Sequence, residues 1–267
     1  MASTLDPILV AVAHGSADPR GSQTIGQLMT VAAGRAPRLD LRTAYLGHAL
    51  PSLPQILSTI EPDAAVAVLP LLLTAAYHSN TDIPRILARF PRLQVSYGAP
   101  LGPHPLLLRA LERRLAEADP AALEDPARTA VVLAAAGSSD PAANAAIARL
   151  AAQWQARVGW SAVRPAYAAP AAGPAPAAAV TSLRQAGTRR VAVATYLLAP
   201  GFFADRIRAC SLAAGAAAVS PALGASPEVA DVLLDRYVQC RPKDATHESE
   251  HPQDRIVGGS PIRATRS

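Results

Sequence analysis

The sequence predicts an α/β protein made of two tandem copies of one unit, each a parallel β-sheet flanked by helices. Two observations carry this prediction. Short apolar runs alternate with helix-like segments, which implies right-handed crossovers between parallel strands. The pattern then restarts near residue 130, with several matching segments at an offset of 122 residues. We therefore expect a duplicated domain.

The first half contains four predicted strands, each followed by a predicted helix. Residues 8–13 read ILVAVA without polar alternation, as in a strand that is buried on both faces. Asp18 and Pro19 then supply a cap and a first-turn proline for a helix. The other expected strands are 39–45, 64–73 and 94–98, and the expected helices are 20–35, 52–60, 82–90 and 105–118.

The second half repeats this order. An apolar strand at 130–135 is followed by AGSSDP at 136–141, which matches HGSADP at 14–19. Val191–Phe203 matches Val66–His78 at an offset of 125, which needs a small insertion. The join between the halves is polar and contains proline. We expect domains at 1–120 and 129–240, followed by a disordered tail at 241–267.

Two histidines define the candidate site. His14 and His78 each follow a predicted strand, and the carboxyl ends of parallel strands are where ligands bind in such sheets. Imidazoles can hold a metal and take up protons. In the second half Ala136 and Phe203 take their places, although the surrounding Gly, Ser, Asp and Pro remain. This favours one site, built on the N-terminal half, with the C-terminal half as a wall of the cleft.

Neighbouring residues are candidates for binding substrate. Gly15 lets the backbone approach a ligand closely, and Ser16 can hydrogen-bond to it. Asp18 is better interpreted as a helix cap than as a substrate contact. His48 follows the second strand at the same edge and is a candidate third site residue. His104 has a weaker claim, because it is expected near a helix start.

Composition excludes several classes of function. The net charge of +5 is spread along the chain without a basic stripe, unlike that of a nucleic-acid-binding protein. No apolar run approaches the ~20 residues that cross a bilayer, and the N-terminus lacks the basic region of a secretion signal. Cys210 and Cys240 are expected to be free thiols in a reducing compartment. We therefore expect a cytoplasmic protein without membrane or nucleic-acid partners.

The quoted residues resemble the sirohydrochlorin chelatase family in its long, two-half form. The resemblance is carried by three segments: HGSxDP at 14–19, the second-strand segment that ends at Pro51-Ser52, and Pro70–Leu73, which leads to His78 and to Asp82-Ile83-Pro84. It extends over about residues 8–237, strongly in the first half and weakly in the second.

The resemblance implies insertion of a divalent metal into sirohydrochlorin, with Fe²⁺ favoured over Co²⁺, for sirohaem or cobalamin synthesis. It implies a four-stranded parallel sheet in each half and catalytic and metal-binding roles for His14 and His78. A family glutamate falls near Gly47, so His48 is a candidate third metal ligand in its place. The substrate bears carboxylates, and Arg20 is a candidate to bind them. The metal would be a substrate, without a prosthetic group, in a monomer or weak homodimer.

Two alternatives stay open. A non-catalytic carrier of metal or tetrapyrrole would keep the same fold and the same histidines. A hydrolase that uses Ser16 with His14 is disfavoured, because no Gly-x-Ser-x-Gly elbow surrounds the serine.

Overall fold

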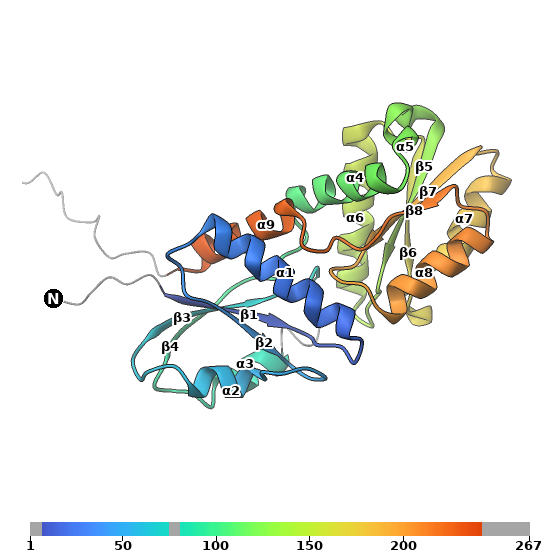
Figure 1. Cartoon of the computed structure of the whole chain (residues 1–267). Helices are drawn as coiled ribbons and strands as arrows, with labels where there is room; N and C mark the ends of the chain where they lie inside the picture. The colour runs from blue at the N-terminus through green and yellow to red at the C-terminus, as the bar shows by residue number, and fades with distance from the viewer. Residues whose placement is uncertain (1–6, 75–80, 242–267) are drawn as a thin grey trace, which may run out of the picture.

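Two parallel four-stranded sheets form the framework of the protein. The computed structural model describes residues 7–74 and 81–241, and the predicted tail and His78 lie outside this part. The strand orders are β2-β1-β3-β4 and β6-β5-β7-β8, so the two halves share one topology (Figure 1). All pairings are parallel. The predicted fold class is therefore confirmed.

The elements alternate along the chain as the sequence predicts. In the first half they are β1 Ile8–Ala13, α1 Pro19–Arg35, β2 Leu41–Tyr45, α2 Leu53–Ser58, β3 Ala65–Pro70, α3 Ile83–Leu87, β4 Gln94–Tyr97, α4 Pro105–Ala118 and the short α5 Ala121–Glu124. In the second half they are β5 Thr129–Ala135, α6 Pro141–Val158, β6 Ala162–Tyr167, α7 Pro176–Gln185, β7 Arg190–Tyr196, α8 Phe202–Ala213, β8 Ala218–Val219 and α9 Pro227–Cys240. Single 3₁₀ turns occur at Pro126–Arg128 and Pro170–Ala172.

The repeated Asp-Pro motif starts equivalent helices. Asp18 caps α1 by accepting the N–H of Arg20 at 3.0 Å, and Asp140 caps α6 by accepting the N–H of Ala142 at 2.8 Å. In each case the proline occupies the first helical turn, where a missing N–H costs nothing. The cap role predicted for Asp18 is thus confirmed. The third strand is shorter than the predicted 64–73, because its sheet pairing ends at Pro70.

The last long helix of each half covers the sheet of the other half. α4 packs on β7 and β8 of the second sheet, whereas α9 packs on α1 and β3 of the first sheet (Figure 1). One hydrogen bond marks each exchange: Trp154 of α6 donates to Glu112 of α4 at 2.7 Å, and Tyr237 of α9 donates to the carbonyl of Pro7 at 2.8 Å. Each sheet is therefore covered on one side by a helix from the other half of the chain, so the packing units differ from the sequence repeats.

This exchange gives the molecule a central core shared by both halves. Strand residues such as Leu9 and Leu133 face this core, together with the buried sides of α1, α4, α6 and α9. The opposite faces of the two sheets carry separate clusters, one under α2 and α3 and the other under α7 and α8. Ion pairs across the exchange, Arg113–Glu228 at 2.5 Å and Arg35–Asp231 at 2.6 Å, tie α9 to α4 and α1.

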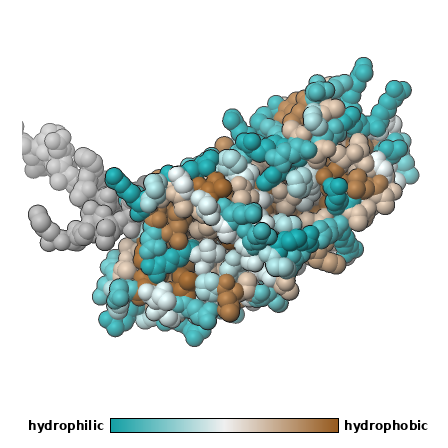
Figure 2. All heavy atoms as spheres, viewed as in Figure 1, coloured by the Kyte–Doolittle hydropathy of each residue, from teal (hydrophilic) through white to brown (hydrophobic). Residues whose placement is uncertain are grey.

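Among the residues that the structure describes, no helix combines the length and apolarity needed to span a bilayer. On the face seen in Figure 2, apolar residues occur in small patches broken by hydrophilic ones.

His104 is a structural histidine with a testable pH effect. It caps α4 through Nδ1, which accepts the N–H of Leu106 at 3.2 Å. Burial and the nearby Arg236 lower the pKa of His104 below its usual 6.5, with Asp235 acting in the opposite direction. Because the unfolded chain then takes up the proton at higher pH than the folded one, stability conferred by the neutral ring should fall as pH drops below 6.5.

We therefore expect His104→Asn to keep the cap and to reduce the loss of stability between pH 7.5 and 5.5, measured by urea unfolding. Asparagine is a good N-cap that does not titrate in this range. His104→Ala should instead lose about 1 kcal/mol at pH 7.5, because it removes the cap. An asparagine variant with the full acid sensitivity of the parent would contradict this role.

Candidate active site

A cavity of about 500 Å³ lies at the carboxyl ends of both sheets. It is lined by equivalent segments of the two halves: the turns after β1 and β5, the first turns of α1 and α6, and the loops after β3 and β7. The first half contributes Ala13–Ser16 and Leu71–Thr74. The second half contributes Ala135–Ser138 and Tyr196–Ala204. The C-terminal half is therefore a wall of the cleft, as the faded repeat predicts.

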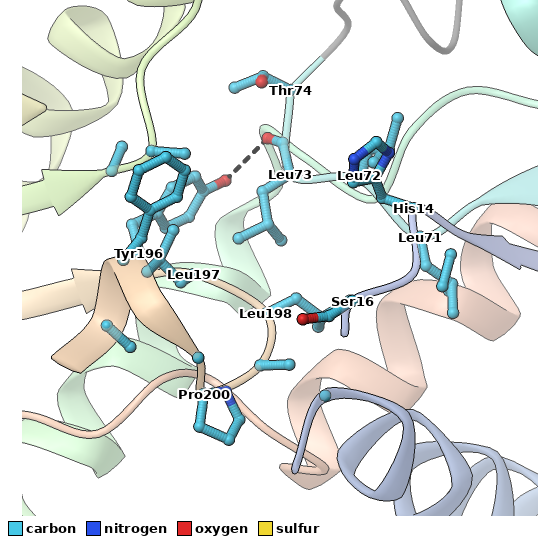
Figure 3. Close-up of a pocket in the computed structure, with 18 of the residues that line it drawn as sticks. His14, Ser16, Leu71, Leu72, Leu73, Thr74, Tyr196, Leu197, Leu198 and Pro200 are labelled. Atoms are coloured by element: carbon cyan, nitrogen blue, oxygen red, sulfur yellow. Dashed lines mark hydrogen bonds between the residues drawn. The ribbon is translucent and has the colours of Figure 1, made fainter. Parts of the chain in front are cut away.

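His14 lies at the mouth of this cavity. It is the first residue after β1, it is exposed, and it is drawn among the lining residues in Figure 3. Its backbone carbonyl accepts the N–H of Gly47 at 3.1 Å, which fixes the turn against the loop after β2. The imidazole is thus presented to the cavity by a turn held at its backbone.

Gly15 is required by this close packing. Its φ is +89°, and a Cβ at this position would come within 1.7 Å of the carbonyl oxygen of Gly47. Ser16 follows, and its Oγ accepts the N–H of Asp18 at 3.1 Å. Gly137 and Ser138 reproduce the same arrangement, with a φ of +85° and a 3.0 Å bond to the N–H of Asp140. The Gly-Ser pattern shared by the two halves thus builds the turn, and the imidazole distinguishes the first half from the second.

Two buried tyrosines line the floor of the cavity. The Tyr196 hydroxyl, at the end of β7, donates to the Leu73 carbonyl at 3.2 Å and so links the halves (Figure 3). Burial raises the pKa of Tyr196 well above its usual 10 and raises the pKa of Tyr45 as well. Both phenols therefore stay neutral at physiological pH and act as donors or packing groups rather than as bases.

The lining is apolar and carries almost no charge. Among the described residues that line the cavity there is no Asp, Glu, Lys or Arg, and His14 carries the one imidazole. Such a site suits a large ligand with an apolar face. Charged groups of that ligand would have to lie at the rim.

Arg20 forms ion pairs with one carboxylate from each half of the chain. Its guanidinium donates to Asp18 at 2.6 Å and to Asp205, in the first turn of α8, also at 2.6 Å. These hydrogen bonds raise the pKa of the guanidinium and lower the pKa values of the two carboxyls. Arg20 is not among the residues that line the cavity, and it bridges the two halves beside it. Its assignment to substrate binding stays a prediction.

The structure describes only two of the three predicted metal ligands, His14 and His48. His48 has a φ of +59°, is exposed, and is not among the residues that line the cavity. His78 lies outside the described residues, although Thr74, the last described residue before it, lines the cavity. Within 7–74 and 81–241 no three His, Cys, Asp or Glu side chains gather as a metal site. The metal roles of His14, His48 and His78 stay predictions.

Sequence reasoning did not single out several lining residues. Tyr45, Tyr196 and Asn144 carry polar groups, and Phe202 and Phe203 carry aromatic rings. The sequence held a signal for some of them, because Tyr45 ends a predicted strand and Phe203 aligns with His78 in the repeat. A rule that asks which residues end or follow each strand in both halves would have found the tyrosines and phenylalanines, but not Asn144, which lies inside α6.

The fold and the cleft define the class of this protein: a tandem, chelatase-like α/β protein with its site between two related halves. The chain belongs to the CbiX family, whose model matches residues 8–118 and again residues 130–240. This confirms the sirohydrochlorin chelatase resemblance seen in the sequence.

Curated relatives include both iron and cobalt enzymes. A sirohydrochlorin cobaltochelatase of Priestia megaterium is 34% identical over 140 residues, which cover 50% of this chain and 45% of that protein. A sirohydrochlorin ferrochelatase of the same organism is 29% identical over 213 residues, covering 76% of this chain and 77% of that protein. The chain thus spans less than half of the first relative and about three quarters of the second.

Solved structures share the fold. SirB from Bacillus subtilis with Fe³⁺ superposes with a TM-score of 0.71 at 24% identity, covering 88% of this chain and 95% of that chain. The structure of CbiX, described as the terminal enzyme for biosynthesis of siroheme in denitrifying bacteria, gives a TM-score of 0.66 at 22% identity, with coverages of 88% and 100%.

Proposed function

We propose that this protein is a sirohydrochlorin chelatase that inserts a divalent metal, Fe²⁺ or Co²⁺, into the free macrocycle. The observation that carries the proposal is the asymmetric cleft. Both halves supply an apolar wall, but only the first supplies an imidazole, with Ala136 at the equivalent position of the second. Family membership and the names of the relatives support the same reaction.

The chemistry requires a metal ligand and a proton acceptor at one place. The free macrocycle carries two pyrrole N–H protons that leave as M²⁺ enters. A neutral imidazole at His14 can hold the incoming metal or accept a proton, but it cannot do both at the same instant. We therefore place metal ligation before proton transfer, with His78 sharing the role. Gly15 and Ser16 would lie against the substrate, because both line the cavity.

The metal is a substrate in this proposal, and no prosthetic group takes part. Imidazole nitrogen suits Fe²⁺ and Co²⁺, and a site with few protein ligands leaves coordination positions for the macrocycle nitrogens. We place iron first. The relatives named above include enzymes for each metal. We further propose that the protein acts in the cytoplasm. We expect a monomer or weak homodimer, because the fused halves already supply both walls of the cleft.

The test is metal insertion by purified protein. Sirohydrochlorin and Fe²⁺ or Co²⁺ are mixed anaerobically, and the change in the visible absorption spectrum is followed with and without protein. We expect protein-dependent acceleration of insertion with one or both metals. Tight binding of sirohydrochlorin without acceleration for any metal would instead favour a non-catalytic carrier of the same fold.

A further inference from the structure

Two adjacent phenylalanines stand exposed at the rim of the cavity. Phe202 and Phe203 begin α8 and are 72% and 41% exposed, although both line the cavity. The chain has only three phenylalanines, so two of them are placed where they bury little surface within the protein. Exposed rings contribute little to folding, whereas they contribute strongly when a ligand covers them. Their position therefore indicates that a bound ligand covers them.

The turn before α8 is built to present these rings. Gly201 has a φ of +151°, a conformation that side chains other than glycine rarely adopt, and it serves as the N-cap of α8. The two ring centroids are 5.8 Å apart with an interplanar angle of 52°. This tilted pair cannot be one continuous flat surface. One ring can lie against the face of a planar ligand while the other meets its edge.

The rings also occupy the positions that the second half no longer uses for chemistry. At the offset of 125 residues, Phe202 and Phe203 correspond to Tyr77 and His78. The turn after β5 likewise has Ala136 in place of His14. The second half therefore lacks both imidazoles, has a phenyl ring at Phe203 in place of one of them, and keeps an aromatic residue at Phe202.

We propose that Phe202 and Phe203 form an aromatic platform in which one ring lies against one face of the macrocycle and the other meets its edge, so that the opposite face is left to His14 and the incoming metal. The proposal rests on the proposed function and assigns the degenerate half a role in it. An aromatic platform suits a conjugated macrocycle, whose broad apolar face matches a cavity whose lining, in the described part of the chain, holds no Asp, Glu, Lys or Arg. The carboxylates of the macrocycle then remain at its edge, outside the apolar lining.

The acid that follows these two rings on α8 is paired with an arginine. Asp205 lies two residues after Phe203, but its carboxylate is bound by Arg20 at 2.6 Å. The approach of the macrocycle to the rings is therefore not opposed by an unpaired acid at that position.

The experiment measures binding of metal-free sirohydrochlorin by titration, followed through its absorption and fluorescence, to the full-length protein. Phe202→Leu, Phe203→Leu and the double variant keep apolar surface but remove the rings. Phe203→Trp keeps an aromatic ring at this position. Leu212→Ala is the matched control, because Leu212 lies on the same helix, is also 41% exposed, and does not line the cavity.

We expect each leucine variant to raise the Kd about five- to tenfold and the double variant to raise it further, as expected for the loss of aromatic stacking. Phe203→Trp should bind near the parent value, and Leu212→Ala should match it. In the insertion assay the leucine variants should raise KM with a nearly unchanged kcat, because the platform binds ground and transition states alike.

The outcomes separate this inference from the proposed function. Leucine variants that bind sirohydrochlorin as tightly as the parent overturn the platform and leave the chelatase reaction standing. Binding that depends on the rings, without metal insertion by the parent, overturns the reaction and keeps the platform. A parent protein that binds no sirohydrochlorin overturns both.

Discussion

Replacing His14 with alanine should lower the rate of metal insertion at least about 100-fold while leaving the fold intact. The size of the effect follows from the loss of a positioned proton acceptor, which typically contributes 10²- to 10⁴-fold. His14 carries the one imidazole of the described cavity lining, so no neighbour in that lining replaces it. Because the side chain is exposed, stability should change by less than about 0.5 kcal/mol. Initial rates and thermal unfolding by circular dichroism measure the two quantities.

Two other histidines serve as controls for this prediction. His104→Asn changes a histidine that caps α4 and does not line the cavity, so it should keep normal turnover. His48→Ala tests the third predicted metal ligand, and we expect a smaller loss than for His14→Ala because His48 does not line the cavity. Turnover of His14→Ala within twofold of the parent would show that His14 is neither the metal ligand nor the proton acceptor.

Most of the fold could be predicted because its signals are local. The apolar run of β1 and the Asp18-Pro19 cap identify a buried strand and a helix start without knowledge of the rest of the chain. The repeat then extends the same prediction to β5 and α6. Helix α4 was predicted within its observed bounds, because Pro105 starts it and an amphipathic run continues to Ala118.

The exchange of α4 and α9 could not be predicted in this way. Amphipathicity shows that α4 has an apolar side but does not identify the sheet that it covers. The repeat adds no information, because α4 and α9 are equivalent helices and each could cover its own sheet. The choice depends on contacts far apart in sequence, such as that of Trp154 with Glu112.

The site shows the same division between local and distant signals. His14 and Gly15 could be identified because a strand end followed by a tight turn is a local pattern. Arg20 was named as a substrate-binding candidate because the implied substrate bears carboxylates, whereas its partner Asp205 lies 185 residues further along the chain. The exposure of Phe202 likewise depends on how the two halves meet at the cavity.

Separating the two halves should unfold or destabilise both of them. In residues 1–125 alone, the apolar side of α4 would lose the second sheet on which it packs, and the first sheet would lose α9. Leu107, Leu111 and Leu115 are completely buried along α4. Exposing a leucine costs roughly 1.5–3 kcal/mol. Three of them thus approach the ~5–15 kcal/mol that stabilises a typical domain.

Tryptophan fluorescence can follow this effect, because Trp154 and Trp160 both lie in the second half and are buried. We expect the emission of residues 126–267 alone to shift to longer wavelength, and to return to the parent value when residues 1–125 are co-expressed. The two fragments should then elute together as a 1:1 complex in size-exclusion chromatography.

The matched control is the full chain cleaved at the join between the halves. It should keep the parent's emission and elution, since the exchanged helices still hold the pieces together. A monomeric, cooperatively unfolding fragment 1–125 would contradict the exchange, because it would mean that α4 stabilises the first sheet without α9.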